Sequence, residues 1–295
     1  MNKQEKTALA MAFRQYWHRN NVVGIDLGYK IKAGKHGKQK CIRLHVREKH
    51  RLTHLAKTER FPKSIGGLPT DVIAATYYSK QANGTPSTQS SIGDSPDSFG
   101  TFGAIVTDTV SGKRCGLTCA HVLKASTNAA GTSRIFQPAP ALSGGHAALI
   151  GALGRFFWND DMDAALIDLN AGITPVTPIP PQVVVNQIAD ARVGMTLEKY
   201  GANTGHTVAR VEGVGRYQVD YGDRVLSFNA FRLLPLTNDG NQITFAGDSG
   251  AIWIDPTNNS VVGLNFAGED TPFPEDEFAL ALPMSRVASM LSFKF

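Results

Sequence analysis

Between residues 245 and 254 the chain reads Phe245-Ala246-Gly247-Asp248-Ser249-Gly250-Ala251-Ile252-Trp253-Ile254. This pattern predicts a tight turn that exposes Ser249 and runs directly into a buried strand. Because Gly247 and Gly250 carry no Cβ, the chain can bend sharply on both sides of the serine. The N–H groups of Gly247 and Ser249 can then point into one small hole, where they would stabilise an oxyanion. The alternative interpretation is an ordinary β-turn, in which the Asp248 and Ser249 side chains bond their own backbone.

Two segments upstream contain the partners that a serine nucleophile needs, because its hydroxyl reacts at neutral pH only with a base beside it. The first, residues 116–123, reads Gly-Leu-Thr-Cys-Ala-His-Val-Leu and predicts an apolar strand that ends at His121. The second, residues 161–169, reads Asp-Met-Asp-Ala-Ala-Leu-Ile-Asp-Leu and places a carboxylate at the head of an apolar run. Asp163 directly precedes this run, so it is preferred to Asp161 as the partner of the histidine.

These three motifs resemble those of the chymotrypsin-like (trypsin-fold) serine peptidases. The family's signatures are Thr-Ala-Ala-His, an Asp that leads an apolar strand, and Gly-Asp-Ser-Gly; this chain reads Thr-Cys-Ala-His, Asp-Ala-Ala-Leu and Gly-Asp-Ser-Gly. Their order, His121 then Asp163 then Ser249, is diagnostic, because subtilisin-like enzymes and α/β-hydrolases carry their triads in other orders. The resemblance implies a mainly β fold of two six-stranded antiparallel β-barrels, preceded by a small α+β domain and ending in a short C-terminal helix.

The resemblance also implies that the chain is a serine endopeptidase that hydrolyses peptide bonds through an acyl-enzyme. Ser249 would be the nucleophile, and His121 the base that takes its proton and later gives it to the leaving amine. Asp163 would bond the other ring nitrogen, and the N–H groups of Gly247 and Ser249 would form the oxyanion hole. In secreted relatives the position of Asp248 pairs with a freed N-terminus. This sequence has no Ile-Val-Gly-Gly-like start, so we expect a different partner for Asp248.

The same resemblance indicates which residues would contact a substrate. The residue six positions before the serine lies at the base of the primary pocket in the family, and here it is Ile243. An apolar floor offers no counter-charge to Lys or Arg, so we expect a small-to-medium apolar residue before the cleaved bond. Phe266, Ala267 and Gly268 match the strand that pairs with substrate backbone by β-augmentation. The expected partner is a protein or peptide substrate, and no cofactor and no metal is expected.

Composition gives the broad class of the protein. The chain has 295 residues, of which 42% are hydrophobic, enough for two to three packed units. Its apolar runs are too short for a membrane span, and its N-terminal segment lacks the apolar run of a secretion signal. Three cysteines give no disulfide framework, which suits a reducing compartment. We therefore expect a cytoplasmic protein without a membrane span.

Four parts are expected along the chain: an N-terminal α+β domain at 1–78, a flexible linker at 79–97, a first barrel at 98–180, and a second barrel with the C-terminal helix at 181–295. The linker is rich in Ser, Gly, Thr, Asn, Pro and Gln, which bury too little apolar area to offset chain entropy, and it is a candidate cleavage site. A Gly-Tyr-Lys strand and an Ile-Arg-x-His-Val strand in the first domain resemble segments that precede the peptidase part of many uncharacterised bacterial trypsin-like proteins.

Charge and resemblance leave alternatives for the function. Residues 1–71 hold 16 Lys and Arg against 5 Asp and Glu, so this part either is a solvated basic surface or binds nucleic acid or an acidic partner. The chain could thus be an adaptor, or a catalytically idle trypsin-like binding module. The presence of all three triad residues favours the enzyme. From the resemblance we expect limited, regulatory proteolysis of a protein partner in a bacterial defence or stress pathway.

Overall fold

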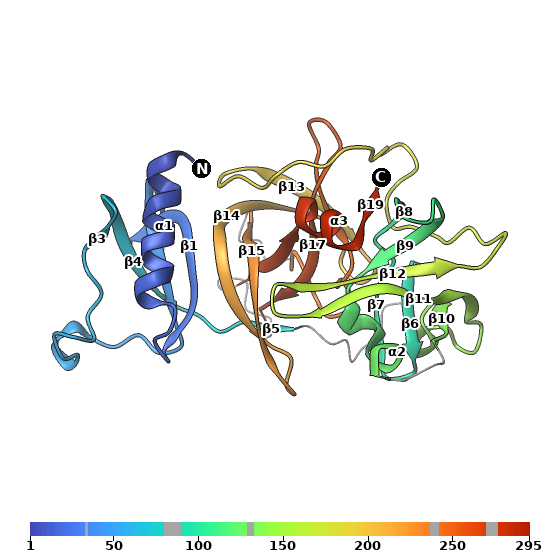
Figure 1. Cartoon of the computed structure of the whole chain (residues 1–295), viewed down its shortest axis with the longest axis horizontal. Coiled ribbons are helices and arrows are strands. Elements are labelled where there is room, and N and C mark those ends of the chain that lie inside the picture. The colour runs from blue at the N-terminus through green and yellow to red at the C-terminus, as the bar shows by residue number, and fades with distance from the viewer. Residues whose placement is uncertain (33–34, 80–89, 129–132, 237–241, 270–276) are drawn as a thin grey trace.

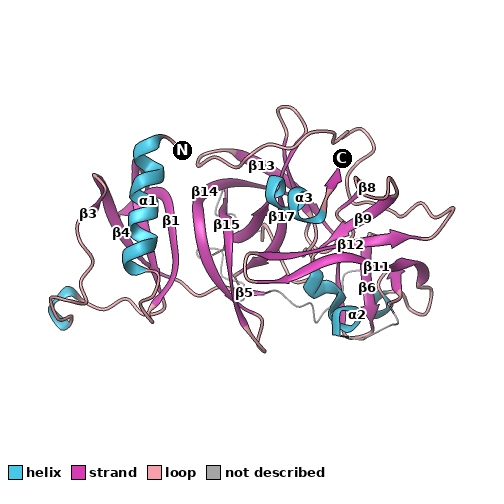
Figure 2. Ribbon diagram, viewed as in Figure 1, coloured by secondary structure: helices cyan, strands magenta, loops and turns pink. Residues whose placement is uncertain are grey.

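The structure is a computed structural model, and it describes residues 1–32, 35–79, 90–128, 133–236, 242–269 and 277–295. Three units follow one another along the long axis of Figure 1: an N-terminal helix on a small sheet, a ring of long strands, and a second sheet. β-Strand is the predominant regular structure, and the helices are few (Figure 2). Among the described residues, no helix has the length and apolar character to cross a bilayer.

The N-terminal unit is built from helix α1 (Lys3–Tyr16), the 3₁₀ turn η1 (Leu52–His54) and strands β1 (Val22–Lys32), β2 (Lys35–Val46), β3 (Ser64–Ile65) and β4 (Leu68–Ala74). The helix begins at a capping box: the Asn2 side chain accepts from the Glu5 N–H, and the Glu5 carboxylate accepts from the Asn2 N–H, both at 2.8 Å. Ala8, Ala12 and Tyr16 lie four residues apart and bury one helix face against the sheet.

The middle unit is a closed ring of six strands. They are β13 (Thr196–Gly201), β14 (Gly205–Asp220), β15 (Val225–Pro235), β16 (Ile252–Asp255), β17 (Ser260–Gly268) and β18 (Ala279–Pro283). Their order is β13-β16-β17-β18-β15-β14, and an additional pairing of β13 with β14 closes the ring. The long strand β14 also pairs with β1, from Gly24 opposite Tyr217 to Gly28 opposite Gly213. The N-terminal sheet is therefore continuous with the ring.

The third unit is an eight-stranded antiparallel sheet in the order β19-β8-β9-β12-β11-β10-β6-β7. Its strands are β6 (Ser91–Ser95), β7 (Ser98–Thr101), β8 (Ala104–Asp108), β9 (Arg114–Thr118), β10 (Ile135–Gln137), β11 (Ala148–Asn159), β12 (Met162–Leu169) and β19 (Phe293–Lys294). Short helical segments connect or follow them: η2 (Ala120–Leu123), α2 (Lys124–Asn128), η3 (Pro140–Leu142) and α3 (Met284–Leu291). Apolar side chains of this sheet and of the ring share one large core.

This architecture agrees with the expected mainly β fold, in which a small α+β part precedes two antiparallel strand assemblies and a short helix lies near the C-terminus. Of the linker expected at 79–97, residues 80–89 lie outside the described residues. On either side of them lie the short strand β5 (Tyr78–Ser79), which pairs with β14 and β17, and β6, which belongs to the eight-stranded sheet.

A buried set of charged side chains joins the N-terminal unit to the ring. Asp26 on β1 accepts hydrogen bonds from Arg43 Nε on β2 at 2.7 Å and from the Tyr217 hydroxyl on β14 at 2.5 Å. Arg43 also contacts Glu212 on β14, and Glu212 pairs with Arg232 on β15. Because these groups are almost completely removed from solvent, each charge depends on its partner for compensation.

We predict that Arg43→Met lowers the free energy of unfolding by about 3–5 kcal/mol at pH 7, because it leaves two buried carboxylates without their shared cation. Burial opposes ionisation of Asp26, but Arg43 and His45 together outweigh it and hold the pKa of Asp26 well below its usual range. In wild type, this lowered pKa contributes stability that is lost as the pH falls. In the variant the pKa of Asp26 should rise, so the deficit should shrink toward pH 4.

Urea denaturation of both proteins at pH 7 and pH 4 measures this difference. Arg51→Met is the matched control, because Arg51 is exposed and should change stability by less than about 0.5 kcal/mol. An Arg43→Met deficit that is absent, or equally large at both pH values, would contradict the prediction.

Candidate active site

The three residues predicted to form a triad come from both strand assemblies. His121 lies in η2, which follows β9, and Asp163 is the second residue of β12, so both come from the unit built on the eight-stranded sheet. Ser249 lies in the turn that precedes β16, which belongs to the ring. All three side chains are buried. The site therefore lies at the seam between the two assemblies.

His121 and Asp163 are bonded to each other through both carboxylate oxygens. Asp163 Oδ2 lies 2.5 Å from His121 Nδ1, and Oδ1 accepts from the His121 backbone N–H at 3.0 Å. The Tyr221 hydroxyl donates to the same Oδ2 at 2.6 Å. Burial, reinforced by the charge of Asp163, raises the pKa of Tyr221 well above its usual value, so the phenol stays protonated and keeps donating. These bonds fix the imidazole with its Nδ1 proton toward Asp163.

The competing carboxylate, Asp161, lies elsewhere. It accepts from Arg216 at 2.6 Å and from the Asn229 amide at 3.0 Å, and its φ of 78° places it in a tight turn between β11 and β12. Arg286 on α3 approaches its other oxygen at 3.3 Å. Asp163, and not Asp161, is therefore the carboxylate that contacts His121.

The Ser249 hydroxyl is not hydrogen-bonded to His121. The Ser249 hydroxyl donates to the Phe266 carbonyl at 3.4 Å, which is long for an O–H···O bond. His121 Nε2 is buried and has no hydrogen-bond partner within the described part of the chain. A shared neighbour brings the two segments together: a Cβ added to Gly100 would lie 2.4 Å from the Val122 side chain and 2.7 Å from the Ser249 carbonyl oxygen.

One backbone carbonyl links the serine turn to the histidine segment directly. The Asn265 carbonyl accepts from the Gly250 N–H at 2.9 Å and from the Cys119 thiol at 3.2 Å. Gly250 follows Ser249, and Cys119 precedes His121 by two residues. The carbonyl of β17 thus holds together the two segments that carry the candidate nucleophile and the candidate base.

The turn around Ser249 depends on its glycines. Gly247 and Gly250 have φ values of +99° and +97°, which residues with a Cβ rarely adopt. Thr101 on β7 fixes both sides of the turn, because its hydroxyl donates to the Gly247 carbonyl at 2.9 Å and its N–H donates to the Ser249 carbonyl at 2.8 Å. Among the described residues, the N–H groups of Gly247 and Ser249 donate to no acceptor. They remain available for an anionic oxygen.

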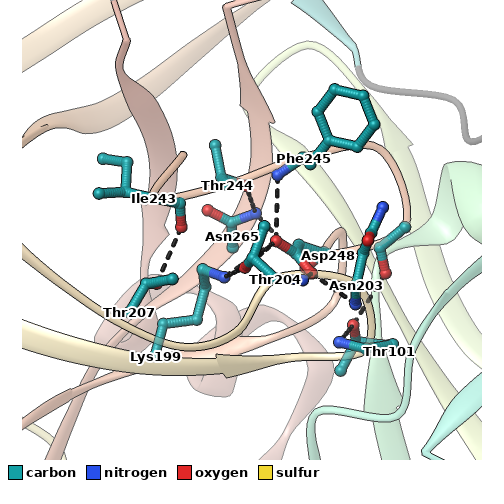
Figure 3. A network of polar contacts seen from close by, with 12 residues as sticks. Thr101, Lys199, Asn203, Thr204, Thr207, Ile243, Thr244, Phe245, Asp248 and Asn265 are labelled. Carbon is teal, nitrogen blue, oxygen red and sulfur yellow. Dashed lines mark hydrogen bonds and ion pairs between the residues drawn. The ribbon is translucent and has the colours of Figure 1, made fainter. Parts of the chain in front are cut away.

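Asp248, between these two N–H groups, is buried and receives five hydrogen bonds (Figure 3). Oδ2 accepts from Lys199 Nζ at 3.0 Å, from the Thr204 hydroxyl at 2.6 Å and from the Phe245 N–H at 3.0 Å. Oδ1 accepts from the N–H groups of Asn203 and Thr204 at 2.9 and 3.0 Å. Burial opposes ionisation, but Lys199 and these donors outweigh it and lower the pKa of Asp248. The expectation that Asp248 has a partner other than a chain terminus is confirmed.

The residues predicted to contact substrate lie on two sides of the serine turn. Phe266, Ala267 and Gly268 are the last three residues of β17, and the Phe266 carbonyl accepts from Ser249. Ile243 is buried in the apolar core of the ring, with its N–H bonded to the Glu277 carboxylate at 3.1 Å. The structure thus brings the strand to the serine and places Ile243 among core residues, and its predicted role in a pocket stays a prediction.

Cys119, His121 and Asp163 have donor atoms within 4.8 Å of one another, a spacing that would also suit a metal ion. Hydrogen bonds within the chain already engage these atoms. The Cys119 thiol donates to the Asn265 carbonyl at 3.2 Å, and burial raises the pKa of this thiol well above its usual value. Both oxygens of Asp163 already accept hydrogen bonds. The group is better described as a histidine–aspartate pair beside a buried, uncharged cysteine.

Sequence reasoning missed three residues of this site: Tyr221, Lys199 and Thr101. Tyr221 lies in a hairpin turn between β14 and β15, where an aromatic residue carries no functional signal. Lys199 lies in an alternating strand, where a lysine normally indicates a solvent-facing position. The one available signal was the carboxylate of Asp248, which had to be buried with the turn and therefore required a cation.

No family model matches the sequence, and no curated protein matches it. By structure, the chain is similar to a glutamic acid-specific serine protease that uses a histidine triad in substrate binding, with a TM-score of 0.52 and 20% identity over 70% of this chain and 97% of that one. It is also similar to the Nocardiopsis protease NAPase, with a TM-score of 0.50 and 14% identity over 69% of this chain and 95% of that one. The chain therefore has the trypsin-like fold of the chymotrypsin-like serine proteases, as the sequence predicts.

Proposed function

We propose that the chain is a serine endopeptidase in which Ser249 is the nucleophile, His121 is the base and Asp163 orients the base. The observation that carries the proposal is the buried imidazole. Its Nδ1 is hydrogen-bonded to Asp163, whereas its Nε2 has no hydrogen-bond partner among the described residues. The segment that carries His121 packs against the turn that carries Ser249. An imidazole held in this tautomer presents a lone pair at Nε2 that can accept a proton.

The reaction would follow from these positions. For attack, the Ser249 hydroxyl would leave the Phe266 carbonyl and donate to His121 Nε2. As Oγ attacks the carbonyl carbon of the substrate, its proton passes to Nε2, and the N–H groups of Gly247 and Ser249 hold the oxyanion. The imidazolium gives this proton to the leaving amine as the C–N bond breaks. Water, deprotonated by the same imidazole, then hydrolyses the acyl ester and restores the hydroxyl.

The substrate would lie along the edge of β17. Phe266, Ala267 and Gly268 offer backbone groups to an extended peptide, which would add to the ring as one more strand. We propose Ile243 as the apolar floor beneath the residue before the cleaved bond, and hence a preference for a small-to-medium apolar side chain. The wider setting, limited proteolysis of a protein partner in the cytoplasm as part of a bacterial defence or stress pathway, stays a prediction. Binding of nucleic acid or an acidic partner by residues 1–71 also stays a prediction.

We predict that a fluorophosphonate probe labels Ser249 in the wild-type chain and does not label Ser249→Ala. The probe reports a serine activated by a base and an oxyanion hole, so it needs no knowledge of the natural substrate. Mass spectrometry of the labelled peptide identifies the residue. Ser260→Ala is the matched control, because Ser260 is a buried serine on β17 and should leave labelling unchanged. A wild-type chain without label would favour the alternative function, a catalytically idle binding module.

The role of Asp163 can be separated from that of Asp161 by the same substitution at both positions. Asp163→Asn should lower kcat by roughly 10⁴-fold, because an amide in place of the carboxylate no longer fixes the imidazole tautomer or stabilises the imidazolium. Asp161→Asn should leave kcat near the wild-type value, because Asp161 bonds Arg216 and Asn229 away from the site. Steady-state hydrolysis of a peptide library substrate measures both. Equal losses in the two variants would refute the assignment.

Lys199 is expected to act as a positioning residue for the oxyanion hole. Lys199→Met leaves the Asp248 carboxylate buried without its cation, and the turn between Gly247 and Ser249 should shift. We predict that the rate of phosphonylation falls by roughly 100-fold, the size expected when reacting groups are misplaced by about 1 Å.

This rate is measured on folded protein below its melting temperature, so a loss of stability alone does not change it. Lys57→Met is the control, because Lys57 is exposed and should leave the rate unchanged. An unchanged phosphonylation rate in Lys199→Met would show that the turn keeps its geometry without the ion pair.

A further inference from the structure

The edge of β17 that faces the serine turn is occupied along its whole length. From Ser260 to Leu264 it pairs with β16. Where β16 ends, the serine turn continues on the same edge: the Asn265 N–H donates to the Ala251 carbonyl at 2.8 Å, and the Asn265 carbonyl accepts from Gly250. The carbonyl of the next residue, Phe266, accepts the Ser249 hydroxyl. A strand that pairs with this edge of β17 beyond Phe266 therefore has one end close to Ser249, the candidate nucleophile.

Strand β5 of the same chain lies at that place. It pairs antiparallel with β17, with Tyr78 opposite Gly268 and Ser79 opposite Ala267. Followed from Tyr78 to Ser79, it runs toward Phe266, the residue whose carbonyl contacts Ser249. Its position is the one proposed above for the backbone of a substrate, and it lies on the side that would become the acyl group.

The backbone groups of β5 that face β17 can be assigned from its other contacts. The Asp220 N–H on β14 donates to the Tyr77 carbonyl at 2.9 Å, so Tyr77 faces β14. In an extended chain, the N–H and C=O groups of successive residues point to opposite sides, so those of Tyr78 face β17. On β17, the Glu269 N–H donates to the Phe278 carbonyl beside β18 at 3.2 Å, so Gly268 faces the other way, toward β5. Both assignments make Tyr78 and Gly268 a hydrogen-bonded pair.

The residue that precedes this pair is firmly anchored. Tyr77 is buried, and its hydroxyl lies 2.6 Å from His45 Nδ1 on β2. Its ring makes edge contacts with Tyr217 and Phe278, both with ring centroids 5.2 Å apart. A segment tethered in this way has a high effective concentration at the edge of β17. Strand β5 can therefore compete with a free peptide even though its own contacts with β17 are few.

We propose that β5 is an intramolecular occupant of the substrate-strand position, so that an extended peptide must displace it before Ser249 can attack. The proposal rests on the proposed peptidase function and adds its regulation. The N-terminal unit supplies the anchor and β5 supplies the two backbone groups that pair with Gly268. Peptides with three or more residues before the cleaved bond compete with β5, whereas a single-residue ester does not reach Gly268.

The test compares Tyr78→Pro with Ser79→Pro. Proline at 78 removes the N–H that faces β17, whereas proline at 79 removes an N–H that faces β14 and leaves the groups of Tyr78 intact. We expect Tyr78→Pro to lower KM for a peptide with four residues before the cleaved bond by about fivefold, the size expected when one backbone hydrogen bond no longer competes. Hydrolysis of an N-acetyl amino-acid ester should not change. Ser79→Pro should behave as wild type with both substrates.

Hydrogen exchange gives a readout that does not depend on activity. The Gly268 N–H should be protected in wild type and in Ser79→Pro, and should exchange faster in Tyr78→Pro, because loss of the residue 78 N–H weakens the pair that holds β5 against Gly268. Suppose that Tyr78→Pro leaves Gly268 protected and KM for the peptide unchanged, while the ester is still hydrolysed and Ser249 is still phosphonylated. The proposal that β5 occupies the substrate position is then refuted, and the peptidase function stands. If no variant reacts with the ester or the phosphonate, the peptidase function fails and the proposed regulation fails with it.

Discussion

The buried carboxylate of Asp248 is the constraint on which the site depends. It lies between two glycines with positive φ, in a turn that the backbone would not adopt without support. Five donors hold it, and they come from β13, from the turn between β13 and β14, and from Phe245. A buried Asp248 carboxylate without a cation would destabilise the fold, so the ion pair with Lys199 holds the turn in position. Among the described residues, the N–H groups of Gly247 and Ser249 on either side of Asp248 donate to no acceptor.

The rest of the molecule brings the proposed base to this turn. His121 comes from the other strand assembly, and its hydrogen bond to Asp163 and its ring contact with Tyr221 hold the imidazole in place. The Asn265 carbonyl links the two segments across the seam. The N-terminal unit is part of the same arrangement, because β1 continues the ring and β5 reaches the edge of β17. Its charged contacts with the ring are buried, so the N-terminal unit packs against the ring as part of one structure.

The sequence alone could predict the parts of the site that local pattern encodes. Ser249, His121 and Asp163 each lie in a short motif, and the apolar run after Asp163 distinguished it from Asp161, whose contacts lie elsewhere. The long-range partners could not be predicted. Lys199 is 49 residues from Asp248, and Tyr221 is 58 residues from Asp163. The strand register that brings such residues together is set by the pairing of the whole sheet. The local pattern of apolar and polar residues does not encode this register.

A crystal structure of the phosphonylated chain tests the central claim most directly. The account predicts phosphorus bonded to Ser249 Oγ, one phosphonyl oxygen about 3 Å from the N–H groups of both Gly247 and Ser249, and His121 Nε2 within hydrogen-bond distance of the adduct. An adduct on another residue would contradict the account. So would a phosphonyl oxygen directed away from Gly247, with His121 Nε2 beyond hydrogen-bond distance of the adduct.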